Sequence, residues 1–325
     1  MKVVVRDPNL VPHRKRLEAA LPPGTSVHWH DATRPALLDD LRDADVFVGS
    51  RFDTEMVGAA EKLRLVHAAG AGIDKIAFTA LAQDVLVANT FHHEQSIAEY
   101  VLAAAVLLRR GFLEQDWALR EGIWATSVYD STIPQPRALQ GARVGFVGFG
   151  HIGRRSWQLF RAFGCTGVAV TGSGSLDAAA EGLSWAADTG SLEELMQASD
   201  VVVVSAPLTE RTTGMIGTEQ LRALGPDGVL INVGRGPLVA ERPLYEALSA
   251  RTIAAAAIDV WYRYPDSDGH AAPSAKPFEK LPNVLMTPHS SGVTANTFVG
   301  RVDDIAANIG RLSRGEPLQN LVVAG

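Results

Sequence analysis

Short apolar runs rich in β-branched residues alternate with helical patterns along the chain. In the first part the runs are KVVV, SVHWH, DVFVGS, LRLVHA and VLVAN. The segments ALLDDLRDA and IAFTALAQ between them have the spacing of amphipathic helices. Because a parallel strand needs a crossover connection, this alternation predicts βαβ units and a mostly parallel sheet.

A second series of the same kind starts at residue 143. Its predicted strands are RVGFV, GVAV, DVVVVS, GVLIN, AAAAIDV and NVLMT, and after Gly292 the chain returns to a helical pattern, ANTFVGRVDDIAANIGRLSRG. Six strands match a doubly wound sheet of the dinucleotide-binding type. Between the two series, EQSIAEYVLAAAVLLRRG predicts a long helix, apolar on most sides, that connects two domains.

Residues 111–140 follow neither pattern. The stretch WALREGIWATSVYDSTIPQPRALQG mixes tryptophan, proline and polar residues without clear periodicity. Long irregular segments in compact enzymes are usually functional, disordered or part of an interface. Trp117 and Trp124 favour an interface arm, because aromatic residues are enriched where proteins meet.

Composition narrows the class of protein. A length of 325 residues with 46% hydrophobic and 20% charged residues predicts two domains with packed cores. The net charge of −6 and the absence of a Lys/Arg run argue against nucleic-acid binding. The stretch VLAAAVLL is too short to cross a membrane, MKVVVRDPNL does not resemble a secretory signal, and a lone Cys165 excludes an internal disulfide. We therefore expect a cytoplasmic protein without a membrane partner.

The sequence RVGFVGFGHIGRR places three glycines directly behind a predicted strand. Gly148 permits a tight turn, Gly150 lets the backbone approach a phosphate, and Gly153 lets helix and strand pack closely. His151 and Ile152 then begin a helix whose N-terminal N–H groups attract an anion. The pattern predicts a bound dinucleotide; the alternative is a purely structural βα turn.

The next predicted strand lacks the acidic residue that usually binds the adenosine ribose. It ends at Thr171, followed by Ser173 and Ser175, and no Asp or Glu occurs before residue 177. An acid there would repel a 2′-phosphate, whereas hydroxyls can donate hydrogen bonds to it. The pattern favours NADP over NAD, with Arg154 or Arg155 as a candidate second contact. If Thr171 is only a turn residue, either cofactor binds.

Three further segments follow predicted strands of the second series, where ligands of such sheets bind. INVGRGPLVAE contains Arg235, AIDVWYRYP contains Asp259, and LMTPHSSG contains His289. Each residue alone has an ordinary structural interpretation as a surface charge or a loop residue. Their joint occurrence at successive strand ends favours a catalytic site.

Together these motifs resemble the D-isomer-specific 2-hydroxyacid dehydrogenase family, and the resemblance covers nearly the whole chain. The motifs are HAAGAGIDKI, IAEYVLAAAV, GARVGFVGFGHIG, SAPLTERTTGMI, INVGRGPLV, AAIDV and TPHSSG. The resemblance implies two α/β domains with doubly wound parallel sheets. A Rossmann cofactor domain, residues 98–292, is inserted in a flavodoxin-like substrate domain made of residues 1–97 and 293–325. It also implies a homodimer, formed through the cofactor domain and the 111–140 arm.

The resemblance also implies roles for single residues. Arg235 would hold the substrate carboxylate and polarise the 2-oxo group, and His289 would be the general acid or base. Asp259 would bind the nicotinamide carboxamide, and backbone N–H groups near Ala71 and Gly72 would bind the substrate carboxylate. The residues expected to line the cofactor site further along the chain are Pro207, Thr212, Val233 and Gly292.

One position departs from the family pattern. Where relatives carry a glutamate paired with the histidine, this chain has Tyr264. A tyrosine orients the ring but supplies no full charge, so His289 is expected to titrate lower than in Glu-bearing relatives. Asp266 or Asp268 is an alternative source of charge. Formate dehydrogenases of the superfamily also replace that glutamate, with a neutral amide, so formate oxidation stays open.

Two further sites have weaker signals. Arg51 follows the run DVFVGS and is a candidate partner for a second anionic group of the substrate, or a solvated loop residue. His92, His93 and Glu94 precede the long helix, but no further ligands with metal-site spacing are evident, so we expect no metal.

Three functions are compatible with these residues. The first is NAD(P)-dependent reduction of a small 2-oxo acid such as glyoxylate or hydroxypyruvate to a D-2-hydroxy acid. The second is a formate- or phosphite-type dehydrogenase. The third is a dinucleotide-sensing binding protein on the same fold, because fold alone does not decide between them.

Overall fold

The computed structural model describes residues 1–30, 34–265 and 269–322. The chain divides into two compact units, Met1–His93 with Thr294–Gly325 and Glu94–Val293. The predicted boundaries, after residues 97 and 292, fall close to these. The difference at the first boundary arises because the helix predicted to connect two domains begins at Glu94 and belongs entirely to the second unit.

The first unit is built on a parallel sheet with strand order β2-β1-β3-β4-β5. This order is that of flavodoxin, as predicted. Its strands are β1 (Lys2–Arg6), β2 (Ser26–Trp29), β3 (Val46–Gly49), β4 (Leu65–His67) and β5 (Leu86–Ala88). Its helices are α1 (Arg14–Ala20), α2 (Arg34–Leu41), α3 (Thr54–Ala59) and α11 (Ala295–Arg314), with 3₁₀ turns at Pro8–His13 and Phe78–Ala80.

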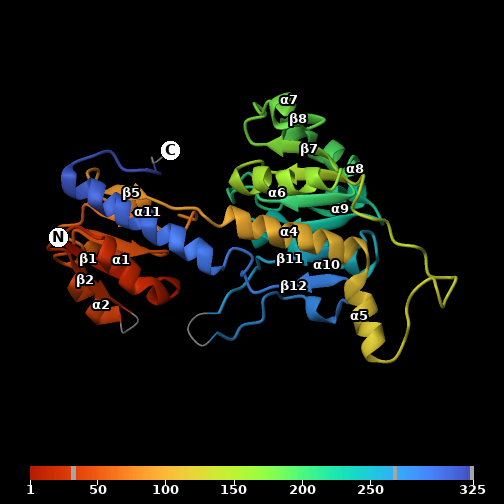
Figure 1. Ribbon diagram of the computed structural model, residues 1–325, viewed down its shortest axis with the longest axis horizontal. Coiled ribbons are helices and arrows are strands. Elements are labelled where there is room, and N and C mark those ends of the chain that lie inside the picture. Colours follow the sequence, from red (N-terminus) through yellow and green to blue (C-terminus); the bar gives the residue numbers. More distant parts are fainter. Residues whose placement is uncertain (31–33, 266–268, 323–325) are drawn as a thin grey trace. The chain divides into compact units, whose positions relative to one another are not determined.

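Apolar residues cover both faces of this sheet. Successive side chains of a strand point to opposite faces. Val3 and Val5 pack with Phe298 and Val302 of α11, whereas Val4 packs on the other face with residues of α2 and α3. Helix α11, blue in Figure 1, therefore completes a core that begins at the other end of the sequence.

The second unit is built on a parallel sheet with order β12-β11-β10-β9-β6-β7-β8. Its strands are β6 (Arg143–Val147), β7 (Thr166–Thr171), β8 (Trp185–Asp188), β9 (Val201–Val204), β10 (Val229–Asn232), β11 (Ala255–Ile258) and β12 (Val284–Met286). Strands β7 and β8 lie on one side of β6 and β9 to β12 on the other, so the strand order reverses between β6 and β9, which is the switch point of a doubly wound sheet. The predicted Rossmann architecture is confirmed.

Helices cover both faces of this second sheet. Helices α4 and α6 contribute to one apolar core, and α8, α9 and α10 to the other. The helices of the unit are α4 (Glu94–Arg109), α5 (Phe112–Arg120), α6 (His151–Ala162), α7 (Ala178–Glu181), α8 (Leu192–Gln197), α9 (Thr218–Leu224) and α10 (Glu241–Ser249). Its 3₁₀ turns are Thr189–Ser191, Gly236–Leu238 and Phe278–Lys280.

Three sequence-based expectations about elements are wrong. The segment IAFTALAQ is not a helix, because Ile76 forms a bridge with Phe52 and only a 3₁₀ turn follows. Strand β8 makes the second sheet seven-stranded, and its sequence WAAD lacks the β-branched residues that mark the other strands. The 111–140 segment contains helix α5, whose exposed apolar residues hide its period.

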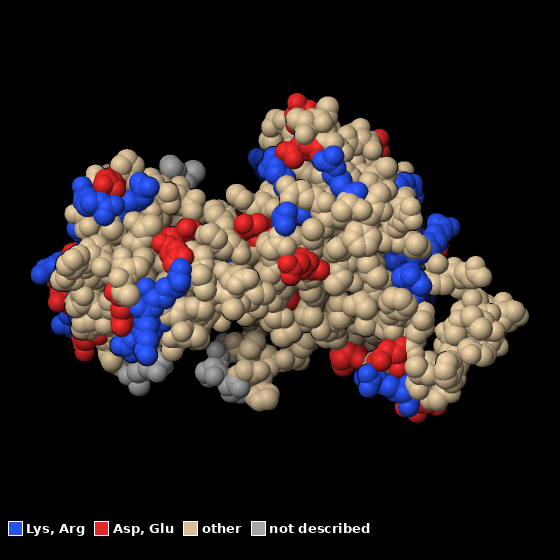
Figure 2. Space-filling model, in the orientation of Figure 1, with Lys and Arg blue, Asp and Glu red and all other residues tan. Residues whose placement is uncertain are grey.

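Beyond α5, residues 121–140 run without helix or strand, as the yellow loop in Figure 1 shows. The visible face of this loop in Figure 2 carries almost no charged side chains. Of the helices in the described ranges, none combines the length and apolar character required to cross a bilayer.

Candidate active site

The loop between β6 and α6 uses its three glycines in different ways. Gly148 has a φ of +89°, and a Cβ there would lie 2.7 Å from the backbone nitrogen of Ala206. A Cβ on Gly153 would lie 2.8 Å from the carbonyl oxygen of Gly148. At Gly150 a Cβ would meet nothing within 4 Å. The outer glycines therefore permit the tight turn and the close helix, and the middle one borders open space.

Helix α6 begins directly behind this open space. His151 is its first residue, and the Gly150 carbonyl accepts a hydrogen bond from the Arg154 backbone nitrogen. The first-turn N–H groups, including those of Ile152 and Gly153, have no acceptor within the helix and lie at its positive end. Space and donors together fit the pyrophosphate of a dinucleotide.

The segment after β7 carries hydroxyl groups rather than a carboxylate. Thr171 Oγ1 accepts a hydrogen bond from the Gly174 backbone nitrogen at 3.1 Å. The hydroxyl oxygens of Ser173 and Ser175 lie 2.8 Å apart, and both side chains are exposed. The hydroxyls are therefore available at the end of the strand that precedes the ribose position in such sheets.

The two arginines predicted as further contacts are engaged elsewhere. Arg154 Nε donates to Glu181 Oε1 at 2.7 Å. Arg155 donates to the side chains of Gln95 and Gln158. The structure therefore gives these arginines partners that the sequence did not suggest.

The turn after β9 is closed by a threonine hydroxyl. Thr212 Oγ1 donates to the carbonyl of Pro207 and accepts from the backbone nitrogen of Thr209, each at 2.8 Å. This turn follows the strand next to β6, so it lies at the same edge of the sheet as the glycine loop.

Asn232, the last residue of β10, shapes the loop that carries Arg235. Its amide donates to the Arg235 carbonyl at 3.0 Å and accepts from the Gly234 backbone nitrogen at 3.2 Å. Val233 is buried and extends the ladder by donating to the Val204 carbonyl. The Arg235 guanidinium is half-buried and donates to the Gly234 carbonyl at 2.8 Å.

Asp259 follows β11 and is completely buried. Its Oδ1 accepts from the Thr287 hydroxyl at 2.6 Å and from the Ser290 backbone nitrogen at 2.9 Å. Its Oδ2 accepts from the Ser291 backbone nitrogen at 3.1 Å and from the Ser291 hydroxyl. All four donors come from the loop after β12, which the sequence-based argument did not connect with this aspartate.

His289 lies within that loop and is exposed, with a φ of +57°. The ring of Tyr264 lies 5.6 Å from the His289 ring, centroid to centroid, with a tilt of 53°. The Tyr264 hydroxyl accepts a hydrogen bond from the Trp261 backbone nitrogen at 3.1 Å. Asp266 and Asp268, predicted as alternative sources of charge, lie outside the described residues.

All these segments lie at one edge of the second sheet. Because every strand in it is parallel, the carboxyl ends of β6, β9, β10, β11 and β12 share that edge. Strands β10 and β12 flank β11, and neighbouring strands are about 4.8 Å apart, so the strands carrying Arg235 and His289 are about 10 Å apart. Gly292 follows Ser291 in the loop after β12 and is half-buried.

The remaining predicted site residues belong to the first unit. Arg51 follows β3, is exposed and lies 3.5 Å from Asp53. Ala71 and Gly72 follow β4, and the Ala71 carbonyl accepts from the Asn89 amide at 3.0 Å. These residues lie at the carboxyl ends of parallel strands, like those of the second unit.

The histidines before α4 do not form a metal cluster with their neighbours. His92 Nε2 lies 2.8 Å from Asp304 Oδ2, and a Cβ on Gly300 would lie 2.5 Å from the His92 ring. In the described part of the chain, no three His, Cys, Asp or Glu side chains form a group able to hold a metal ion.

Two contacts near the site were not predicted from the sequence. The hydroxyl of Tyr100, in α4, lies 3.0 Å from that of Thr287, and burial raises the pKa of Tyr100 to about 12. In the first unit, Arg301 Nε donates to the Phe91 carbonyl at 3.0 Å, and its guanidinium lies 3.3 Å from the place of a Cβ on Gly70. Nothing in the sequence indicated the second contact.

Comparison with known proteins supports the sequence resemblance. Residues 102–291 match the family described as D-isomer specific 2-hydroxyacid dehydrogenase, NAD binding domain. A D-3-phosphoglycerate dehydrogenase of Methanocaldococcus jannaschii is 29% identical over 296 residues, which are 89% of this chain and 54% of that protein. The chain thus spans about half the length of such relatives. A glyoxylate reductase of Korarchaeum cryptofilum is 30% identical over 303 residues, 90% of this chain and 88% of that protein.

Solved structures share the fold. The NAD-complexed crystal structure of a D-isomer specific 2-hydroxyacid dehydrogenase from Lactobacillus delbrueckii ssp. bulgaricus has a TM-score of 0.81 at 22% identity. The match covers 99% of this chain and 100% of that one. The sequence match over the NAD-binding domain and the near full-length match to the reductase decide the assignment: the chain belongs to the D-isomer specific 2-hydroxyacid dehydrogenase family.

Proposed function

We propose that this protein transfers a hydride between NAD(P)H and the 2-oxo group of a small 2-oxo acid, giving a D-2-hydroxy acid. The observation that carries the proposal is the shared edge of the second sheet, where the glycine loop, Arg235 and His289 follow parallel strands. Family membership supports it, as do relatives named glyoxylate reductase and D-3-phosphoglycerate dehydrogenase.

When bound, the dinucleotide would supply the hydride. Arg235 binds the substrate carboxylate, because a guanidinium can donate two parallel hydrogen bonds to it. The same fixed cation stabilises the negative charge that develops on the 2-oxo oxygen as the hydride reaches carbon 2. His289 donates its proton to that oxygen during reduction and accepts it during oxidation. The backbone N–H groups of Ala71 and Gly72 are proposed to bind the carboxylate as well.

Tyr264 is proposed to orient the His289 ring rather than to charge it. The two rings are 5.6 Å apart, and the tyrosine hydroxyl is anchored by the Trp261 backbone nitrogen. A phenol held in this way restricts the imidazole without adding the charge of a carboxylate. Position 264 carries a tyrosine and not a carboxylate beside the proton-transfer group. This feature also favours a formate- or phosphite-type reaction as the second candidate.

We infer that the site accepts NADPH, the cofactor that the sequence favours. The segment after β7 presents the hydroxyls of Ser173 and Ser175 and no carboxylate that would repel a 2′-phosphate. Arg154 and Arg155 do not add to this proposal, since both pair with other side chains. The Ser173→Asp variant is expected to lower kcat/KM for NADPH relative to NADH; an unchanged ratio would contradict the inference.

We propose a second copy of this chain as the partner of the 111–140 arm. The exposed fraction is 68% for Trp117, 60% for Trp124 and 78% for Val128. A groove of about 840 Å³ lies beside the arm, lined by parts of α4, α5 and residues 133–137. Apolar exposure on this scale is typical of an interface.

Sedimentation of a Trp124→Ser/Val128→Ser variant tests the dimer. The variant is expected to sediment as a monomer at concentrations where the parent is dimeric. The control is Phe163→Ser, which removes an exposed aromatic residue of the same unit outside the arm. A parent that is monomeric throughout would refute the partner proposal.

Cofactor oxidation with a panel of 2-oxo acids tests the reaction. We expect turnover with NADPH or NADH, reduced about 100-fold or more in Arg235→Gln and in His289→Asn. Arg242→Gln is the matched control, because Arg242 is exposed and pairs with Glu246 on the surface of α10. Turnover solely in the reverse assay, with formate or phosphite, would favour the second candidate. Tight dinucleotide binding without any turnover would favour a sensor.

A further inference from the structure

Two successive backbone N–H groups of the loop after β4 are available to a ligand. They belong to Ala71 and Gly72, which are half-buried where the chain bends. Among the described residues, neither N–H donates a hydrogen bond to a protein acceptor. Successive backbone N–H groups in a turn can bind an anion. This arrangement agrees with the carboxylate-binding role proposed for them.

The carbonyl groups of the same loop are held from one side. Asn89, directly after β5, donates through its side-chain amide to the Ala71 carbonyl at 3.0 Å. The Thr90 backbone nitrogen donates a longer hydrogen bond, 3.5 Å, to the Gly70 carbonyl. The peptide bonds of the loop are trans, and in a planar trans peptide the N–H of the next residue points opposite to the carbonyl. The bonds to the two carbonyls therefore turn the N–H groups of Ala71 and Gly72 away from the segment after β5.

Helix α11 fixes the segment that holds these carbonyls. Asp304 Oδ2 accepts hydrogen bonds from the Thr90 hydroxyl at 2.7 Å and from His92 Nε2 at 2.8 Å. The Phe91 carbonyl, between these two residues, accepts from Arg301 Nε at 3.0 Å. Thr90 is completely buried. Three successive residues are thus bonded to one helix, and such a network restricts the movement of the segment.

We propose that Asn89 and Thr90 are positioning residues, which aim the N–H groups of Ala71 and Gly72 at the substrate carboxylate, with Asp304 as their anchor on α11. The inference deepens the proposed function and rests on it for the role of the two N–H groups. A hydrogen bond weakens steeply when its donor is misdirected, so a rotation of either peptide loosens the hold on the anion. Because the carboxylate does not react, these contacts stabilise the bound substrate and the transition state alike.

Three variants test the proposal in the full-length protein. Asn89→Ala removes the amide donor without adding a charge. Thr90→Val removes the hydroxyl that is bonded to Asp304 and keeps the shape of the side chain, whereas Thr90→Ser retains a hydroxyl. Thr25→Val is the matched control, because the half-buried Thr25 hydroxyl donates to the Pro22 carbonyl at 2.7 Å, in the turn before β2.

Steady-state kinetics separate substrate binding from the chemical step. We expect Asn89→Ala to raise KM for the 2-oxo acid about 10-fold, because misdirected donors lose hydrogen bonds to a charged group. Its kcat stays within about threefold of the parent value, since the lost contact is the same in both states. Thr90→Val raises KM less, and Thr90→Ser and Thr25→Val leave it within about twofold. The dissociation constant for NADPH stays within about twofold in every variant.

Oxamate, an unreactive carboxylate with the shape of a small 2-oxo acid, gives a readout that does not depend on turnover. In protein labelled with ¹⁵N at alanine and glycine, the amide resonances of Ala71 and Gly72 are expected to shift when oxamate is added at saturating NADPH. Without oxamate, the same resonances are displaced in Asn89→Ala and Thr90→Val. Oxamate binds about 10-fold more weakly to Asn89→Ala. Thr90→Ser and Thr25→Val behave like the parent.

The outcomes distinguish this inference from the proposed reaction. A parent protein without turnover would refute the reaction, and the oxamate titration would still decide the role of the loop. Oxamate that leaves the Ala71 and Gly72 resonances of the parent in place would overturn the inference. Unchanged resonances, KM and oxamate affinity in Asn89→Ala would overturn it as well. If Asn89→Ala does not fold, Thr90→Val compared with Thr90→Ser decides by the same criteria.

Discussion

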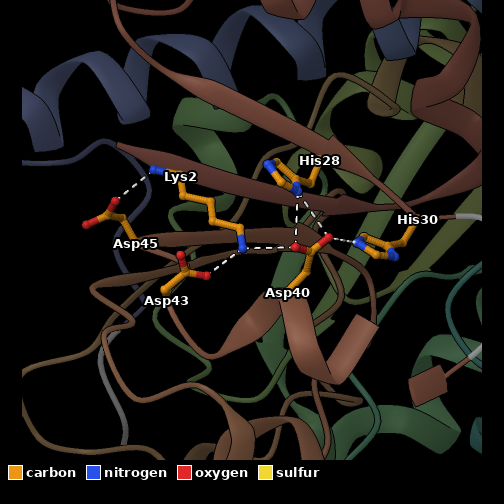
Figure 3. A network of polar contacts seen from close by, with 6 residues as sticks. All are labelled: Lys2, His28, His30, Asp40, Asp43 and Asp45. Carbon is orange, nitrogen blue, oxygen red and sulfur yellow. Dashed lines mark hydrogen bonds and ion pairs between the residues drawn. The ribbon is translucent and has the colours of Figure 1, made fainter. Parts of the chain in front are cut away.

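Two aspartates organise polar clusters in the two units by different means. Asp259, in the second unit, is buried and accepts hydrogen bonds from neutral N–H and O–H groups alone among its described partners. Asp40, in the first unit, accepts from Lys2 at 2.9 Å, His30 at 2.6 Å and His28 at 3.1 Å, as Figure 3 shows. Its side chain is 28% exposed.

The difference lies in what holds each carboxylate. Burial alone would raise the pKa of Asp40, but the hydrogen bonds from Lys2, His30 and His28 hold it well below its usual value of 3.8. That cluster depends on charge, so salt and pH change it. The Asp259 cluster depends on well-directed hydrogen bonds from neutral donors, and salt weakens such bonds little. A loop that aims a side chain needs the second kind of support.

The largest expected effect on stability comes from Asp259→Asn. The amide can accept on one side only, so about two hydrogen bonds to a charged group are lost, each contributing about 2 kcal/mol. We expect the free energy of unfolding to fall by about 4 kcal/mol, equally in low and high salt. Urea unfolding at both salt concentrations measures it. A loss that shrinks strongly in high salt would place this cluster in the same class as that of Asp40.

The next effect belongs to His67, a buried histidine of the first unit. Burial lowers its pKa from 6.5 to about 4. In the folded chain the ring stays neutral where the unfolded chain binds a proton. His67 therefore does not lower the free energy of unfolding above about pH 6.5. As the pH falls toward 4, the free energy of unfolding falls by about 3 kcal/mol, because the unfolded chain gains the proton first. Unfolding between pH 7 and 4 measures this slope, and His67→Gln should abolish most of it. An unchanged slope in the variant would assign the acid sensitivity elsewhere.

Tyr264→Glu would place beside His289 the arrangement found around Asp40, a carboxylate next to an imidazole. A nearby negative charge stabilises the imidazolium and raises its pKa. We expect the pH limit of 2-oxo acid reduction to rise by about one pH unit, or about 1.4 kcal/mol. A pH–rate profile of the variant measures it, with Tyr264→Phe as the uncharged control. Coincident profiles for wild type and Tyr264→Glu would remove the argument about the missing glutamate.

The smallest effect is expected for Asp40→Asn. Its partners are partly exposed, and such pairs contribute about 1 kcal/mol or less. Because the pKa of Asp40 is lowered in the folded state, Asp40 adds to the free energy of unfolding above about pH 4, and this addition declines as the pH falls below that. The difference in unfolding free energy between variant and parent should shrink in 1 M salt and again toward pH 2. Insensitivity to both would mean that packing, not charge, holds the cluster.

The sequence allows the fold to be predicted where strands carry β-branched residues. Runs such as VVVV at 201–204 are unambiguous, whereas WAAD in β8 forms a strand only because it pairs with β7. Helix α5 escapes detection because its apolar residues face outward and give no period. In both cases the missing information is the neighbouring surface, not the local sequence.

The sequence likewise allows some residues of the site to be predicted and not others. Arg235, Asp259 and His289 stand out because each follows a strand of a parallel sheet. The partners of Asp259 do not stand out, because Thr287 and Ser291 are common residue types about 30 positions away. Their relation to Asp259 exists only once β11 and β12 pair.

The first unit is made of two separate segments of the sequence, and this has a consequence for folding during biosynthesis. Its core includes Phe298, Val302 and Ile305 of α11, which the ribosome makes after the entire second unit. A nascent chain that has reached residue 293 therefore carries a first sheet with one apolar face only partly covered, by Leu10 and by Leu17 of α1. Every strand of the second sheet has by then been synthesised. We expect the inserted unit to fold first during translation and helix α11 to close the other one, so pauses just before α11 is synthesised would expose an aggregation-prone surface.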